Sequence, residues 1–270
     1  MTPKSRDRRD EPALYDVVAE ALPACRGAID RWRRVGGARR DKLNLHGRIE
    51  PVTAADEQVQ DLLIGALRAA WPDVTVVAEE HATELPAEIV ADCVVVDPID
   101  GTTSLLAGTP DYAIAVCRVR RGRSNEAVVD FPAYHLTLTA TAATGLRAHG
   151  DLARLPMYGS DVVLCSPAQV PAATQWARRV GGVRTAAVAT ASVKMALVAT
   201  GRAQTAVYLP GGQGAAVWDY AAAALLVAAT GGIVRDSVGR DLTRNLPGWI
   251  DGWTAIGAAG QRAPSAPREA

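Results

Sequence analysis

Residues 93–103 read CVVVDPIDGTT, a stretch that contains both a strand and the turn that ends it. Its first four residues are apolar and mostly β-branched, which is typical of a short buried strand. Pro98 stiffens the turn and Gly101 lets it bend sharply, so Asp97 and Asp100 can converge on one volume. Because strand ends hold polar groups rigidly at the edge of a sheet, this stretch predicts a functional site as well as a strand.

The two aspartates of this turn predict a cation between them. Carboxylates that lie this close repel each other and raise each other's pKa unless a cation separates them. A hard divalent cation with oxygen ligands, above all Mg²⁺, removes that repulsion. Thr102 and Thr103 add hydroxyl and N–H groups just past the glycine, where a phosphate can be bound.

Two other motifs built on aspartates are excluded by spacing. An EF-hand loop that began at Asp97 would have Ile99 at its third position and Gly108 at its twelfth, and neither offers a carboxylate. A phosphatase with a covalent aspartyl nucleophile of the DxDGT type would need an aspartate where Pro98 stands. The site is therefore expected to activate a water molecule.

Other acidic residues lie at the ends of further predicted elements. Glu79 and Glu80 follow the strand VTVVA, Asp219 starts a long apolar helix, and Asp56 lies three residues after Thr53 in a capping-box pattern. Each has an ordinary structural explanation: a solvated strand end, a favourable charge at a helix N-terminus, or a cap.

Composition excludes several classes of protein. Of the 270 residues, 49% are apolar and 21% are charged, and 29 basic residues balance 29 acidic ones. No strong field therefore favours nucleic acid or an anionic membrane as a partner. The apolar run 220–229 is about half the ~20 residues that span a bilayer, and the four cysteines form no CxxC pair. We expect a cytoplasmic enzyme with free buried thiols.

The order of elements predicts a layered fold in two halves. Residues 1–12 and 261–270 are expected to be disordered tails, and the arginine-rich stretch 31–40 a flexible connection. Residues 13–155 contain helices followed by a mostly antiparallel sheet that carries the DPIDGTT turn. Residues 156–260 alternate helices and strands around the Trp218–Asp219 motif. The pattern predicts an α+β or α/β sandwich.

Four motifs in this order resemble those of one family. They are EE at 79–80, DPIDGTTSLLAGTPDYAIAV at 97–116, TASVKMALVATG at 190–201 and WDYAAAALLVAATGG at 218–232, and PVTAADEQV at 51–59 adds an upstream VTxxD element. Together they resemble the inositol monophosphatase superfamily, which includes inositol monophosphatases, histidinol phosphatases and bisphosphate nucleotidases. The resemblance covers residues 51–257.

The resemblance implies a five-layer αβαβα sandwich that hydrolyses a small phosphomonoester with two or three Mg²⁺ ions, in a homodimer. Residue by residue, it implies the following roles. The metal ligands are Glu79, Asp97, the carbonyl of Ile99, Asp100 and Asp219. Thr102, with Glu79 and backed by Asp56, orients the attacking water. The substrate is bound by Asp100, Gly101, Thr102, Ala191, Lys194 and Asp219.

The substrate side of the sequence departs from inositol monophosphatases. Residues 203–217 contain no acidic residue, although those enzymes place there a glutamate that binds inositol hydroxyls. Lys194 resembles the lysine of the GSxxK element of bisphosphate nucleotidases, and an anionic group on the substrate would pair with it. A nucleotide or nucleoside phosphate is therefore favoured. The alternatives are inositol-1-phosphate, histidinol phosphate, or a catalytically silent paralogue that only binds a metabolite.

Overall fold

The computed structural model describes residues 11–37, 39–45, 47, 49–180 and 184–258. The α-helices are α1 (Leu14–Val35), α2 (Ala54–Ala70), α3 (Thr102–Leu106), α4 (Val170–Val180), α5 (Ala191–Ala199) and α6 (Val217–Ala229). Short 3-10 helices are η1 (Pro132–Tyr134), η2 (Leu152–Arg154) and η3 (Pro167–Gln169).

The strands fall into two large sheets and several two-stranded pairs. One sheet has six strands in the order β3 (Val76–Ala78), β5 (Cys93–Asp100), β6 (Ala113–Arg120), β7 (Arg123–Phe131), β8 (Leu136–Thr141) and β9 (Gly145–His149). The other has five strands in the order β11 (Arg184–Ala187), β10 (Gly159–Cys165), β12 (Ala203–Tyr208), β17 (Trp253–Ile256) and β14 (Ile233–Asp236). The pairs are β1 (Arg39–Leu43) with β2 (Ile49–Thr53), β4 (Glu88–Ile89) with β15 (Leu246–Pro247), and β13 (Ala215–Ala216) with β16 (Trp249–Ile250).

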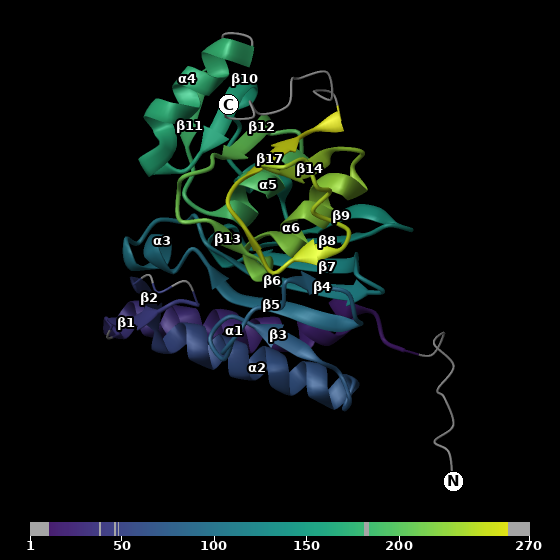
Figure 1. Cartoon of the computed structure of the whole chain (residues 1–270). Helices are drawn as coiled ribbons and strands as arrows, with labels where there is room; N and C mark the ends of the chain where they lie inside the picture. The colour runs from purple at the N-terminus through teal and green to yellow at the C-terminus, as the bar shows by residue number, and fades with distance from the viewer. Residues whose placement is uncertain (1–10, 38, 46, 48, 181–183, 259–270) are drawn as a thin grey trace.

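These elements stack in five layers, which confirms the predicted αβαβα sandwich (Figure 1). Helices α1 and α2 cover one face of the six-stranded sheet, and α5 and α6 lie between the two sheets. Helix α4 packs on the outer face of the five-stranded sheet. Three apolar clusters fill the spaces between the layers: one under α1 and α2, one around α5 and α6, and one under α4.

Strand β5 explains why the sequence around the DPIDGTT turn is so apolar. Its side chains alternate between faces: Val94 and Val96 belong to the cluster under α1 and α2, and Val95 belongs to the cluster around α5 and α6. Because helices cover both faces of the sheet, all eight residues of β5 are buried. Asp97 and Asp100 continue this strand and are therefore buried as well.

The prediction of a flexible connection over residues 31–40 was wrong. Helix α1 runs without a break through Pro23 to Val35, and Gly36 ends it in the left-handed conformation (φ 66°). Strand β1 then begins at Arg39 and pairs antiparallel with β2. The helix continues to Val35 because arginine has a good helix propensity. Strand β1 was missed because its pairing with a segment about ten residues further on is not visible in the local composition.

The expected division of the chain and its expected tails stay predictions. Residues 1–10 and 261–270 lie outside the described residues, whereas Glu11 accepts hydrogen bonds from Arg118 and Arg120. The six-stranded sheet uses residues 76–149 and the five-stranded sheet residues 159–256, although β4 and β15 pair across the expected boundary at 155. Cys25, Cys93, Cys117 and Cys165 are free and buried, as predicted. None of the described helices combines the length and apolar character needed to cross a bilayer.

A buried ion pair joins α1 to the six-stranded sheet and gives a stability prediction. Asp130 on β7 is fully buried; it pairs with Arg26 of α1 and accepts a 2.7 Å hydrogen bond from Thr137 Oγ1. Arg26→Met removes the guanidinium and leaves a buried carboxylate with too few donors, which should lower the free energy of unfolding by about 2 kcal/mol. Urea unfolding followed by circular dichroism measures this change.

An exposed pair of the same type provides the control. Arg184 and Asp161 form a salt bridge in which both side chains are more than half exposed. Arg184→Met should change the free energy of unfolding by less than about 0.5 kcal/mol because solvent screens the pair. Equal effects of the two substitutions would show that the Arg26–Asp130 pair contributes no more than a surface contact.

Candidate active site

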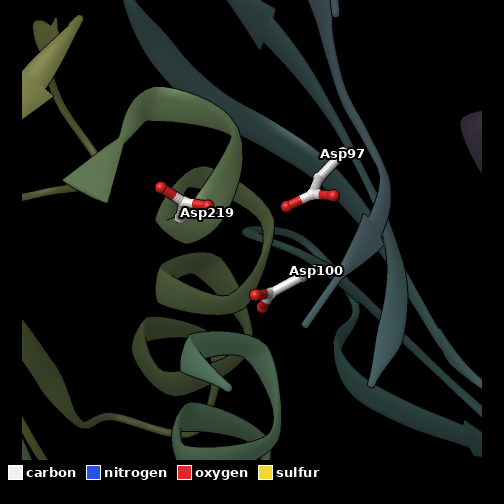
Figure 2. Close-up of side chains that lie close together, drawn as sticks. All are labelled: Asp97, Asp100 and Asp219. Carbon is white, nitrogen blue, oxygen red and sulfur yellow. The ribbon is translucent and has the colours of Figure 1, made fainter. Parts of the chain in front are cut away.

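Three aspartates from two elements of the fold, β5 and α6, meet at the edge of the six-stranded sheet. Asp97, Asp100 and Asp219 each offer a carboxylate oxygen, and these three oxygens lie within 4.8 Å of one another. Asp97 and Asp100 come from the end of β5, and Asp219 comes from the first turn of α6. Figure 2 shows the three side chains pointing toward one another across the gap between strand and helix. The convergence predicted from the DPIDGTT turn is present, and Asp219, which the resemblance implied as a further ligand, lies with the two aspartates.

Asp97 provides the strongest indication that this cluster holds a cation. Its side chain is 1% exposed, and neither carboxylate oxygen has a hydrogen-bond partner among the described residues. A buried polar atom without a partner costs about 1–3 kcal/mol, and more when it is charged. Oxygen ligands that are buried, acidic and unpaired fit a hard divalent cation such as Mg²⁺. The donor set therefore fits the metal that the sequence predicted.

Burial raises the pKa of every acid in this group. Burial, followed by repulsion from Glu79 and Asp100, raises the pKa of Asp97 well above its ordinary value. Burial, followed by repulsion from Asp100, likewise raises the pKa of Asp219 well above its ordinary value. Burial raises the pKa of Asp100 to about 6, although hydrogen bonds from Ser192 oppose the shift. Without a cation, protons reduce the repulsion, and a divalent ion would take their place.

The N-termini of two helices hold the side chains of Asp100 and Asp219 in position. The N–H of Ser192, in the first turn of α5, donates to Asp100 Oδ2 at 2.7 Å. The N–H of Ala216 donates to Asp219 Oδ2 at 2.6 Å, where α6 begins. Each bond engages one oxygen and sets the orientation of the side chain, and the positive end of the helix dipole stabilises the negative charge.

Glu79 lies beside this cluster, with a partner that the sequence did not predict. Lys42 on β1 places its Nζ 3.0 Å from Glu79 Oε1 and 2.6 Å from Glu80 Oε2. Burial raises the pKa of Glu79 to about 8, although Lys42 opposes the shift. Burial opposes the charge of Lys42, but the two glutamates outweigh it and raise the pKa of the lysine. The signal available in the sequence was the rarity of lysine, which occurs only at positions 4, 42 and 194.

Glu79 is not one of the three carboxylates that lie within 4.8 Å of one another, but it borders the same cavity. Its effect on the pKa of Asp97 and of Asp219 indicates that the charges lie close. Its role as a metal ligand stays a prediction, as does that of the carbonyl of Ile99, which also borders the cavity.

Thr102 and Asp56 form a hydrogen-bonded pair at the site. Thr53 and Asp56 make the predicted capping box at the start of α2: Asp56 Oδ2 accepts from Thr53 N at 2.8 Å and from Thr53 Oγ1 at 2.6 Å. The other oxygen, Oδ1, accepts from Thr102 Oγ1 at 2.8 Å. A threonine hydroxyl that donates to a carboxylate keeps lone pairs with which to accept a hydrogen bond from a water molecule. The geometry suits the orientation of a nucleophilic water.

Gly101 makes the sharp turn that the sequence predicted. Its φ is +96°, and a Cβ at this position would lie 2.4 Å from Thr190 Oγ1 and 2.8 Å from Asp111 O. Only glycine fits, and the turn leads directly into α3 at Thr102. Ala191, the first residue of α5, borders the same cavity and lies between Thr190, which packs against Gly101, and Ser192, which donates to Asp100.

The aspartates line one end of a large cavity. It has a volume of about 840 Å³, which suits a metabolite much larger than inorganic phosphate. Its lining also includes aromatic residues and a glycine-rich loop: Tyr208, Trp249, Trp253 and residues 211–214. The same cavity therefore combines acidic groups for a cation with an aromatic surface for the rest of a substrate.

Lys194 is a buried cation on the wall of this cavity. Its Nζ donates to Ser166 Oγ at 2.8 Å and to Ala189 O at 3.2 Å, and it lies 5.5 Å from the ring centre of Trp253 and 5.8 Å from that of Tyr208. Burial lowers the pKa of Lys194 to about 8, although Asp100 opposes the shift. A lysine can also bury its stem and extend its amine to solvent. Lys194 does not do so, because its whole side chain is buried.

The sequence of the chain matches a known family over most of its length. The family model described as the inositol monophosphatase family matches residues 13–263. The Nus factor SuhB of Escherichia coli (strain K12) is 30% identical over 199 residues, which cover 70% of this chain and 72% of that protein.

Solved structures share the fold at low sequence identity. An IMPase/NADP phosphatase complexed with Mg²⁺ and phosphate superposes with a TM-score of 0.72 at 19% identity, covering 90% of each chain. An IMPase/NADP phosphatase complexed with NADP and Ca²⁺ gives a TM-score of 0.72 at 18% identity, covering 93% of this chain and 94% of that one. With the family match over residues 13–263, these likenesses lead to one conclusion: the chain belongs to the inositol monophosphatase family and is a phosphatase.

Proposed function

We propose that this phosphatase uses Mg²⁺ to hydrolyse a small phosphomonoester, with a nucleotide or nucleoside phosphate as its substrate. The observation that carries the proposal is Asp97, whose two buried oxygens have no donor while two further aspartates lie within 4.8 Å. Membership of the family supports the reaction class, and the cavity beside the aspartates supports a substrate larger than phosphate.

Five groups of the chain would hold two or three Mg²⁺ ions. They are Asp97, whose two oxygens are unpaired among the described residues, with Glu79, the carbonyl of Ile99, Asp100 and Asp219. Bound Mg²⁺ supplies charge neutralisation for the phosphate and lowers the pKa of a coordinated water. Phosphoryl transfer depends mainly on positioning and on charge, which this donor set can provide.

The remaining roles belong to side chains that position groups. Thr102, which donates to Asp56, would accept a hydrogen bond from the attacking water and orient the lone pair of that water toward phosphorus, and Glu79, which borders the same cavity, would take the proton. The N–H groups of Gly101 and Thr102 would bind the phosphate oxygens, and Ala191 would border the substrate without obstructing it. A water nucleophile needs no histidine or cysteine in this arrangement.

The substrate preference rests on the far wall of the cavity. With no acidic residue in 203–217, hydroxyl groups of a polyol lack a charged acceptor there. Lys194 provides a buried cation for a second anionic group of the substrate. A related fold has been solved with NADP, so this architecture accommodates a nucleotide. Inositol-1-phosphate and histidinol phosphate are the rival substrates. Assembly as a homodimer, a cytoplasmic location and the absence of nucleic-acid partners stay predictions from the sequence.

Asp97→Asn tests the proposed catalytic centre. The wild type should release phosphate from at least one of AMP, a bisphosphate nucleotide, inositol-1-phosphate and histidinol phosphate, and only with Mg²⁺. The variant should lose at least a thousandfold in kcat/KM while its circular dichroism is unchanged, because an amide cannot bridge two cations. Asp161→Asn, a change at an exposed residue, should retain full activity.

Two results would contradict this centre. Appreciable turnover by Asp97→Asn would remove Asp97 from the metal site. No phosphate release by the wild type from any of the four compounds would favour the silent, metabolite-binding paralogue.

Thr102→Ala separates water positioning from metal binding. The variant should lower kcat by about a hundredfold, within the range for a positioned proton-transfer group, and should change the Mg²⁺ dissociation constant less than twofold. Thr102→Ser, which keeps the hydroxyl, should recover most of kcat. Steady-state kinetics and calorimetric Mg²⁺ titration give the two quantities, and an unchanged kcat would exclude Thr102 from the reaction.

The raised pKa values predict how stability depends on pH in EDTA. Burial raises the pKa of Glu79 to about 8 and of Asp100 to about 6, whereas both titrate near 4 when unfolded. Between those values the folded chain binds more protons than the unfolded chain, so the contribution of these groups to stability decreases as pH rises from about 4 to 8. Asp97→Asn removes a carboxylate that repels Glu79 and Asp100. The variant should therefore have a higher melting temperature than the wild type at pH 8 and a similar one at pH 5.

Mg²⁺ should reverse the order at pH 8, where it stabilises the wild type and not the variant. Differential scanning fluorimetry in EDTA and at Mg²⁺ concentrations that increase in 10-fold steps measures both effects. A wild type that is as stable as the variant in EDTA at pH 8 would show that the carboxylates do not destabilise the metal-free fold.

A further inference from the structure

The indole of Trp249 forms a rigid wall of the cavity beside the aspartates. Strand β16 pairs with β13 so that Trp249 lies directly opposite Ala216, the residue whose N–H holds Asp219. The Cβ atoms of such directly opposed residues lie about 5 Å apart. Trp249 is half-buried and lines the same cavity as Asp219, so a substrate held at the aspartates would lie next to the ring.

One glycine packs against this ring, and another fixes the backbone next to it. A Cβ at Gly214 would lie 2.3 Å from Trp249 Cζ2, so the loop packs directly on the indole. A Cβ at Gly248 would lie 1.9 Å from Pro86 O, and the N–H of Gly248 donates to Ala87 O at 3.1 Å, so the backbone next to Trp249 is fixed as well. The ring is therefore positioned before any substrate binds, and a rigid aromatic surface binds a ligand at low entropic cost.

Polar side chains near this wall are already engaged within the protein. The amide of Gln169 donates to Leu209 O at 2.7 Å and accepts from Leu209 N at 3.0 Å. The hydroxyl of Tyr208 accepts from Gln213 N at 2.6 Å, and Ser166 accepts from Lys194. A polyol placed here would exchange hydrogen bonds to water for few new ones, which disfavours it.

A flat heteroaromatic ring matches the same wall. Its face would cover the indole, and the loop at 211–214, which lines the same cavity, would lie beside its edge. Stacking is favourable for any base because each presents a π face.

We infer that Trp249, backed by Gly214, is the residue that stacks on the base of a nucleoside monophosphate while its phosphate lies at Asp97, Asp100 and Asp219. The inference rests on the proposed function, since it places the leaving group of that same reaction. It assigns the preference for a nucleotide to one side chain that belongs to none of the recognised motifs.

The test compares a substrate that has a base with one that does not. We measure kcat and KM with Mg²⁺ for AMP and for glycerol 2-phosphate in the full-length wild type, Trp249→Ala, Trp249→Phe and Trp32→Ala. Trp32 is also a half-buried tryptophan, but it lies on α1 and does not line the cavity. The quantity of interest is the ratio of kcat/KM for AMP to that for glycerol 2-phosphate.

Trp249→Ala should lower this ratio about tenfold, the loss of one base–aromatic stack, with the change in KM rather than in kcat. Trp249→Phe keeps an aromatic face and should lower the ratio less than threefold. Trp32→Ala should leave the ratio at the wild-type value. Variants are compared at a temperature at which circular dichroism shows each to be folded.

Two results would overturn the inference alone: an unchanged ratio in Trp249→Ala, or a wild type that hydrolyses glycerol 2-phosphate at least as efficiently as AMP. If the wild type releases phosphate with Mg²⁺ from neither compound, nor from a bisphosphate nucleotide, inositol-1-phosphate or histidinol phosphate, the proposed function fails and the inference fails with it. If Trp249→Ala does not fold, the ratios of the wild type and of Trp249→Phe decide. A preference for AMP in the wild type that is kept when phenylalanine replaces Trp249 supports stacking.

Discussion

Repulsion among buried carboxylates is the constraint on which this site depends. Asp97, Asp100 and Asp219 lie within 4.8 Å of one another, and both oxygens of Asp97 lack a donor among the described residues. Such a cluster is costly unless protons or a cation neutralise it. The rest of the fold supplies the free energy that holds it together, through helices packed on both faces of the sheet that carries Asp97.

Helix N-termini reduce that cost from several directions. Helix α5 donates the N–H of Ser192 to Asp100, α6 begins at the N–H that holds Asp219, and the cap of α2 contains Asp56. Each N-terminus carries a partial positive charge and N–H groups that need an acceptor. Asp56 and Asp219 therefore stabilise the starts of α2 and α6, which is the structural role that the sequence predicted for them, and the same placement is compatible with the roles proposed for them in the site.

The lining of the cavity comes from segments of different character. The end of β5 and the starts of the helices supply the acidic groups. The aromatic lining residues Tyr208, Trp249 and Trp253 lie on β12, β16 and β17, and the segment 203–217 contains no acidic residue. Under the proposed function, the catalytic centre and the surface that selects the substrate would therefore come from different segments, so one could change while the other is kept.

The sequence by itself determined many of the helices and strands, a layered α+β or α/β class and the sharp turn at Asp97–Gly101, because alternation, capping and glycine requirements are local. The capping box at Thr53–Asp56 and the buried strand β5 follow from the residues that form them. Contacts between distant segments were decided only by the tertiary structure. The β1–β2 pair brings Lys42 to Glu79 and Glu80 across 37 residues or more, and no local pattern marks that approach. In the same way β13 and β16 place Trp249 beside Asp219, because strand pairing is set by packing of the whole chain and not by the propensities of either strand.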